Sequence, residues 1–116
     1  MKYILLLGGT MEPEERAKNP ELAAAYERVG QWFEQYTRSG KIVEAHELQG
    51  PQTATTVRFK DGKAMVVDGP FIEAKEVIGG YAIVEVADLD EALQMAKSWP
   101  GLTSVEIRPI VDHSAD

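Results

Sequence analysis

One stretch decides how the strands of this chain are counted: TATTVRFKDGKAMVV, residues 53–67. Its first part, Thr53–Phe59, is rich in threonine and valine and predicts a strand. Asp61 and Gly62 then form a residue pair that two-residue hairpin turns prefer, because the central positions of such turns need a positive φ. Lys63–Val67 is therefore expected to pair with Thr53–Phe59 as an antiparallel hairpin.

The other predicted elements lie on either side of this hairpin. Asn19 can cap a helix, Pro20 suits the first helical position, and Gly40 marks a helix end. Asp88 with Glu91 resembles a capping box at the start of a second helix. We expect helices at Pro20–Ser39 and from Asp88 to Trp99. We expect strands at Lys2–Gly8, Lys41–Leu48, Tyr81–Val86 and Thr103–Ile110. Loops are expected at Asp68–Ile78 and at Thr10–Asn19, which has room for one helical turn at Glu14–Ala17.

The resulting order is β-α-β-β-β-β-α-β. Without the hairpin it becomes β-α-β-β-α-β, which is the ferredoxin-like pattern of an α+β fold. A chain of 116 residues fits one domain, and we expect residues 1–116 to form it.

Composition and charge restrict the classes of function. The chain has no cysteine, so disulfides and cysteine-bound zinc are excluded. Its net charge of −7 disfavours direct binding to nucleic acid or to an anionic membrane. No apolar run approaches the about 20 residues of a membrane helix. We expect a cytoplasmic protein without a cofactor or metal, since phosphate loops, dinucleotide fingerprints and metal-ligand spacings are missing from the sequence.

The predicted sheet has apolar residues on both faces. Tyr81 and Ile83 share one face of their strand, while Ala82, Val84 and Val86 share the other. Two helices cover only one face of a ferredoxin-like sheet, so the other face needs a cover. We expect a homodimer, in which a second copy packs on that face. The alternative is that the inserted hairpin folds back over it.

Residues 66–76, VVDGPFIEAKE, followed by Gly79-Gly80-Tyr81, resemble the signature of the YCII-related family and of its DGPF subgroup. Four further stretches, residues 1–3, 54–58, 88–92 and 105–109, resemble that subgroup as well, so the likeness spans nearly the whole chain. The resemblance implies a ferredoxin-like domain that forms a dimeric α/β barrel.

The resemblance implies less about function. Members occur beside or fused to extracytoplasmic-function sigma factors, and a distant relative is a dehydrochlorinase of aromatic compounds. A His–Asp pair has been proposed as the active site of the founding branch, where the histidine is associated with a helix. In this chain the internal histidine is His46, which we expect on a strand.

The Asp-Gly-Pro-Phe segment has two interpretations. Asp68 can shape a tight turn by bonding to nearby backbone N–H groups, or it can direct a catalytic carboxylate into a pocket. Phe71 forms an apolar wall in both cases. Lys75 belongs either to a solvated charged surface or to the lining of a substrate site.

Strand alternation predicts a second group of polar residues. Glu85 shares a face with Tyr81 and Ile83. Glu106 and Arg108 lie opposite the apolar face of the last strand. We expect all three charged side chains on the face without helices. They form either an ion-paired network or an acid–base site in which Arg108 holds an anionic ligand.

His46 alternates with Ile42, Glu44 and Leu48 on its strand, and it is either a structural or surface residue or a catalytic one.

Two functions therefore stay open. The first is a small cofactor-free enzyme that carries out acid–base chemistry, of the lyase or elimination type, on a small molecule. The second is a non-catalytic ligand-binding or regulatory module, associated with a sigma factor and acting through a protein partner.

Overall fold

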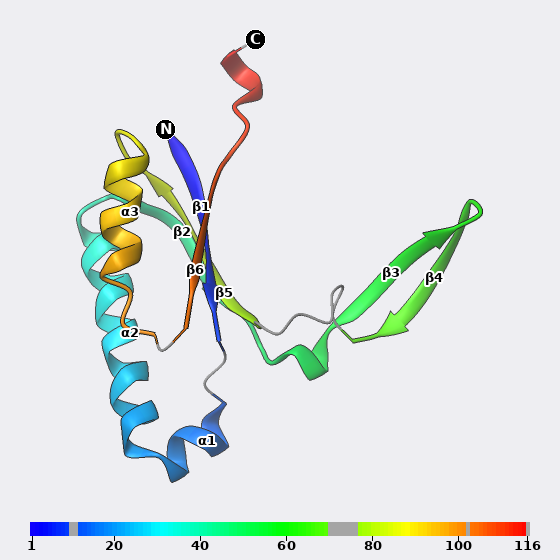
Figure 1. Cartoon of the computed structure of the whole chain (residues 1–116), viewed down its shortest axis with the longest axis horizontal. Helices are drawn as coiled ribbons and strands as arrows, with labels where there is room; N and C mark the ends of the chain where they lie inside the picture. Colours follow the sequence, from blue (N-terminus) through cyan, green and yellow to red (C-terminus); the bar gives the residue numbers. More distant parts are fainter. Residues whose placement is uncertain (10–11, 70–76, 102, 116) are drawn as a thin grey trace.

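A computed structural model describes residues 1–9, 12–69, 77–101 and 103–115 (Figure 1). Its helices are α1 (Pro13–Lys18), α2 (Pro20–Arg38) and α3 (Leu89–Lys97). Its strands are β1 (Lys2–Gly8), β2 (Ile42–Glu47), β3 (Thr55–Lys60), β4 (Lys63–Asp68), β5 (Ile78–Glu85) and β6 (Val105–Pro109). Short 3-10 turns lie at Pro51–Thr53 and His113–Ala115.

Both predicted helix starts are capped by the expected side chains. Asn19 accepts hydrogen bonds from the backbone N–H groups of Glu21 and Leu22, which lack partners within α2. Asp88 accepts from the N–H of Glu91, and the Glu91 carboxylate accepts from the N–H of Ala87. These caps fix where α2 and α3 begin.

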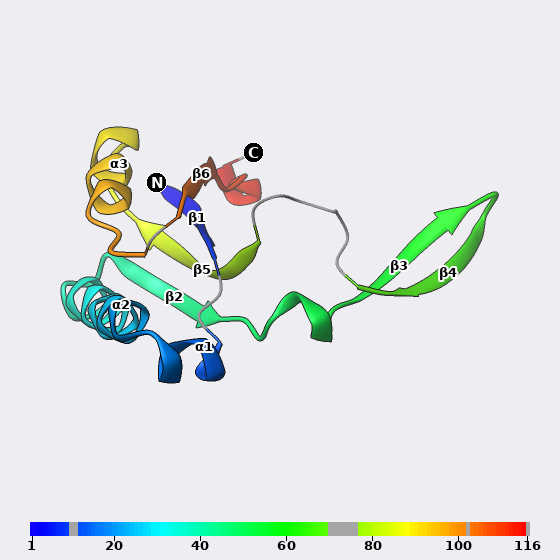
Figure 2. The ribbon, with the colours of Figure 1, turned by 60° about the horizontal axis from the view of Figure 1, so that its bottom comes forward.

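Four strands form an antiparallel sheet in the order β2-β5-β1-β6. Both α2 and α3 lie on one face of it (Figure 2). This arrangement confirms the α+β class and is consistent with a ferredoxin-like fold. The buried core lies between the sheet and the helices and consists of Tyr3, Leu5, Leu7, Trp32, Ile42, Ala82, Val84, Val86, Ala92 and Met95.

The opposite face of the sheet carries Ile4, Leu6, Tyr81 and Ile83, all half-buried. We call it the open face, because no α-helix of the described chain covers it. The β3–β4 hairpin does not cover it either, and instead projects away from the sheet (Figure 1). The folded-back hairpin considered from the sequence is therefore wrong.

Three local details differ from the sequence-based expectation. The single helical turn expected at Glu14–Ala17 is longer and forms the helix α1, Pro13–Lys18. Strand β5 begins at Ile78, because Gly79 and Gly80 continue the ladder. The register shifts between Ile42 and Glu44, so Ile42 is buried under the helices instead of sharing a face with His46.

Within the described ranges, no helix is long and apolar enough to cross a membrane.

Candidate functional site

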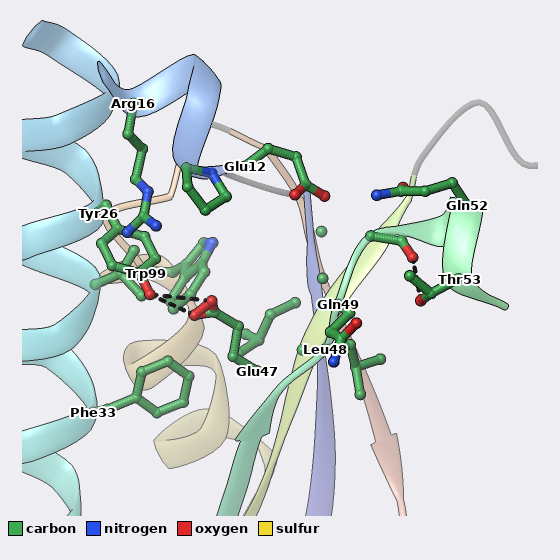
Figure 3. A pocket seen from close by; sticks show the side chains of 18 residues that line it. Glu12, Arg16, Tyr26, Phe33, Glu47, Leu48, Gln49, Gln52, Thr53 and Trp99 are labelled. Carbon is green, nitrogen blue, oxygen red and sulfur yellow. Dashed lines mark hydrogen bonds between the residues drawn. The ribbon is translucent and has the colours of Figure 1, made fainter. Parts of the chain in front are cut away.

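A pocket of about 370 Å³ opens at one end of the sheet, where β1, β2 and β5 approach α1 and α2 (Figure 3). Apolar side chains form much of its wall: Leu7, Val29, Phe33, Leu48 and Trp99. Glycines 8, 9, 79 and 80 bring the strand backbones to its edge. Polar groups enter from Glu12, Arg16, Tyr26 and Glu47, so the pocket joins an apolar body to a charged end.

Tyr26 and Glu47 form the central polar contact of this pocket. The phenol O–H of Tyr26 donates to the Glu47 carboxylate, at 2.7 Å to Oε1 and 3.1 Å to Oε2. This hydrogen bond raises the pKa of Tyr26 above the ordinary tyrosine value, and burial adds to the rise. Tyr26 therefore stays protonated at neutral pH and holds the Glu47 carboxylate in place.

Arg16 adds a permanent positive charge beside that pair. Its guanidinium lies over the Tyr26 ring, 3.8 Å from the centroid, in a cation–π contact. The charge of Arg16 favours a tyrosinate and so opposes part of the rise in the Tyr26 pKa. Helix α1 holds Arg16 there, since α1 packs against α2, which carries Tyr26.

Two buried N–H groups of the pocket residues have no hydrogen-bond partner among the described residues. They are Nε of Arg16 and Nε1 of Trp99. The indole nitrogen of Trp99 points towards the α1 side of the pocket (Figure 3). A buried donor without a partner costs about 1–3 kcal/mol.

Gly50 sets the shape of the pocket opposite α1. It is buried, and a Cβ at this position would overlap the side-chain ends of Glu12 and Gln52. Glycine thus lets these two polar groups close over the backbone next to the opening. Within the described ranges, no three His, Asp or Glu side chains gather as ligands for a metal.

Most residues selected from the sequence lie elsewhere, on the open face. Cross-strand pairing gives one row of His46, Tyr81, Leu6 and Glu106, and a second row of Glu44, Ile83, Ile4 and Arg108. His46 and Arg108 therefore occupy opposite edge strands, about 14 Å apart at the usual strand spacing. One copy of the chain does not bring them into a single site.

The charged groups on that face already have partners. Arg108 donates to the Glu106 carboxylate at 2.8 Å, which is the mutual pairing considered from the sequence. Glu85 lies 3.7 Å from the amino group of Met1. The His46 ring lies 5.6 Å from the Tyr81 ring, and both side chains are on the same face.

The Asp-Gly half of the DGPF motif lies at the base of the hairpin, away from the pocket lining. Asp68 ends β4 and is exposed. Gly69 has a φ of 115°; its N–H donates to the carbonyl of Ala54, and its carbonyl accepts from the hydroxyl of Thr56. These bonds, made by Gly69 and not by the Asp68 carboxylate, join the two ends of the hairpin. Phe71 and Lys75 lie outside the described residues.

Sequence reasoning missed the pocket because its polar residues come from separate elements. Glu47 gave one usable signal: it shares a strand face with Ala45, which packs towards the helices. Glu47 itself is exposed, so this position marks the solvent-open rim of the helix-covered face. Its hydrogen-bond partner is Tyr26 of α2, which lies 21 positions away and forms no local sequence pattern with Glu47.

Taken together, the chain is an antiparallel α+β protein with a pocket at the end of its sheet. The profile of the YCII-related domain matches residues 1–114, and the chain belongs to this family. It is also similar to an uncharacterised protein of Rhizobium meliloti (strain 1021), with 37% identity over 79 residues. That match spans 65% of this chain and 64% of the relative, slightly under two thirds of its length.

Proposed function

We propose that this YCII-related protein, of the DGPF subgroup, is a small cofactor-free enzyme. It carries out acid–base chemistry of the elimination type on a small molecule, with Glu47 as the base. The observation that carries the proposal is the Tyr26–Glu47 hydrogen bond in a pocket lined also by two N–H donors that have no partner among the described residues. A pocket with an apolar wall and a few polar groups is typical of small-molecule sites.

The chemistry needs a base near the ligand and a donor for the charge that develops. Glu47 takes a proton from a carbon of the ligand, the electrons of that C–H bond form a C=C bond, and the leaving group departs with its bonding pair. Tyr26 positions the Glu47 carboxylate. The Arg16 and Trp99 N–H groups offer hydrogen bonds to a ligand oxygen, and Arg16 adds a stabilising charge.

The ligand class follows from the lining. Val29, Phe33 and Trp99 suit an apolar or aromatic body. The unpartnered donors suit a carbonyl or another oxygen acceptor at the charged end.

A dimeric barrel is part of the proposal. The apolar centre of the open face is half-buried in one copy, and a second copy packed on it would bury this centre. The two-fold arrangement could also bring His46 of one copy towards Arg108 of the other, which would assemble the residues expected from the sequence.

The test begins with a thermal-shift screen of small aromatic and aliphatic carbonyl compounds, with and without a halide leaving group. The compounds that bind are then assayed for product. For a turned-over compound, we expect Glu47→Gln to retain binding but lower kcat at least about 100-fold, because the amide cannot accept the proton.

Glu106→Gln is the matched control, since it makes the same change on the open face. Full turnover by Glu47→Gln would contradict the pocket mechanism. Loss of turnover in Glu106→Gln or Glu85→Gln alone would move the chemistry to the open face. Binding without product in the wild-type protein would favour the alternative, a ligand-binding or regulatory module associated with a sigma factor.

A further inference from the structure

We infer that the β3–β4 hairpin is an arm that packs against a second copy of this chain. The inference rests on the proposed dimer and goes beyond it, because the open face alone could hold two copies together. Four independent features of the described structure support it.

The first feature is an exposed apolar strip on the hairpin. Cross-strand pairing places Val57 opposite Val66 and Phe59 opposite Ala64, so these four side chains share one face. Phe59 is 77% exposed and Val66 is 71% exposed. Large apolar side chains that lie next to one another on a surface are typical of interaction sites.

The second feature is the weak attachment of the hairpin to its own chain. It forms a separate two-stranded sheet, and it contributes nothing to the buried apolar core. Thr56 is the buried residue at its base, where its hydroxyl bonds to Gly69. A lone two-stranded hairpin is only marginally stable in water, so this one needs a packing partner.

The third feature is the extent of the surface. The described chain exposes 8361 Å². A compact monomer of the same mass, 12.8 kDa, would expose about 6300 Å². The excess of about 2000 Å² per chain exceeds the about 800 Å² that each partner buries in an interface of standard size, so it leaves enough surface for a second copy. The radius of gyration, 16.3 Å, likewise exceeds the about 13 Å of a compact domain of this length.

The fourth feature is charge, which identifies the partner as an acidic surface. Arg58, Lys60 and Lys63 share the other face of the hairpin. The chain as a whole carries a net charge of −7. A second copy offers both an acidic surface and an apolar open face. The hairpin projects away from the sheet of its own chain (Figure 1).

The test compares wild-type protein with Val66→Asp by sedimentation velocity between about 1 and 100 μM, a range that brackets typical reversible dimers. We expect a wild-type dimer, and we expect Val66→Asp to raise the dimer Kd at least about tenfold, because a charge would be buried in the contact. Val111→Asp is the matched control. Val111 is 72% exposed, lies in the C-terminal tail, and should leave the Kd unchanged.

Hydrogen exchange of the wild-type protein gives a measurement that needs no variant. Amides of residues 55–68 should exchange more slowly at 100 μM than at 1 μM. If Val66→Asp leaves the dimer Kd unchanged, or if Val111→Asp raises it as strongly, the inference that the hairpin packs against a second copy is wrong. The proposed dimer itself would still stand. A wild-type monomer at all concentrations would overturn both.

Discussion

Tyr26 links the pocket to a measurable titration. Its pKa is raised first by the hydrogen bond to Glu47 and then by burial. We expect Glu47→Ala to bring the Tyr26 pKa back towards 10.0, the ordinary value, because the acceptor of its proton is lost. The absorbance of tyrosinate in an alkaline titration measures the change.

The control for that titration is Tyr26→Phe, which removes this phenol. In the Tyr26→Phe background, adding Glu47→Ala should not change the tyrosinate titration curve. Burial and the nearby Glu44 carboxylate also raise the pKa of Tyr81, which should not change in these variants. A Tyr26 titration that Glu47→Ala does not move would contradict the described contact.

The same shift has a consequence for stability. A raised folded-state pKa means that the protonated form is favoured by folding. The stabilisation from Tyr26 is therefore complete below about pH 10 and is lost as the pH rises through its folded-state pKa. We expect the melting temperature of wild-type protein to fall more steeply above pH 10 than that of Tyr26→Phe, as measured by circular dichroism.

Single residues also show what sequence can and cannot predict. Asp61 and Gly62 have φ values of 52° and 77°, as the hairpin turn requires, because turn geometry depends on adjacent residues. Glu47 and Tyr26 are 21 positions apart, and only the folded chain brings them together. A helix cap can be predicted because it depends on neighbouring residues in the sequence. The pocket cannot, because it depends on contacts that form only in the folded chain.

At the scale of elements, α2 and α3 are joined through Trp32. Its indole N–H donates to the carbonyl of Met95 at 3.2 Å and to the hydroxyl of Ser98 at 3.0 Å. Its ring makes edge-to-face contacts with Phe33, Tyr36 and Trp99. Since Trp99 also lines the pocket, this cluster connects the core to the site.

We expect Trp32→Phe to lower the free energy of unfolding by about 2 kcal/mol, because it loses a buried hydrogen bond and leaves a gap in the cluster. Chemical denaturation measures the loss. Gln31→Ala, on the exposed side of the same helix, should stay within about 0.5 kcal/mol of wild type. Equal stability of both variants would show that Trp32 does not join the helices as described.

Element boundaries were less predictable than element types. Alternation along Lys41–Leu48 assumes a regular strand, but the shift between Ile42 and Glu44 turns Ile42 inward. A bulge of this kind depends on the neighbouring strand and leaves little trace in the local sequence. Helix α1 is short, and it is stabilised by its packing on α2 more than by its own propensity.

For the whole molecule, the described structure separates into a body that carries the core and pocket and an arm that carries neither. The two ends of the arm lie together, since the N–H of Gly69 donates to the carbonyl of Ala54 at 2.8 Å. The sequence predicted the hairpin itself but not its direction. Where it points depends on the connections to the sheet and on what it packs against.

The arm should therefore be removable. We expect a variant in which Ala54 and Gly69 are joined by a short Gly-Ser linker, without residues 55–68, to fold and to dimerise more weakly than wild type, because only the open face is left to hold two copies together. Its near-ultraviolet circular dichroism should match that of wild type, because the aromatic cluster around Trp32 lies entirely in the body. It should also bind any pocket ligand found by the screen, since no residue of the arm lines the pocket. Loss of the aromatic signal would mean that the body depends on the arm, and an unchanged dimer Kd would place the interface on the open face alone.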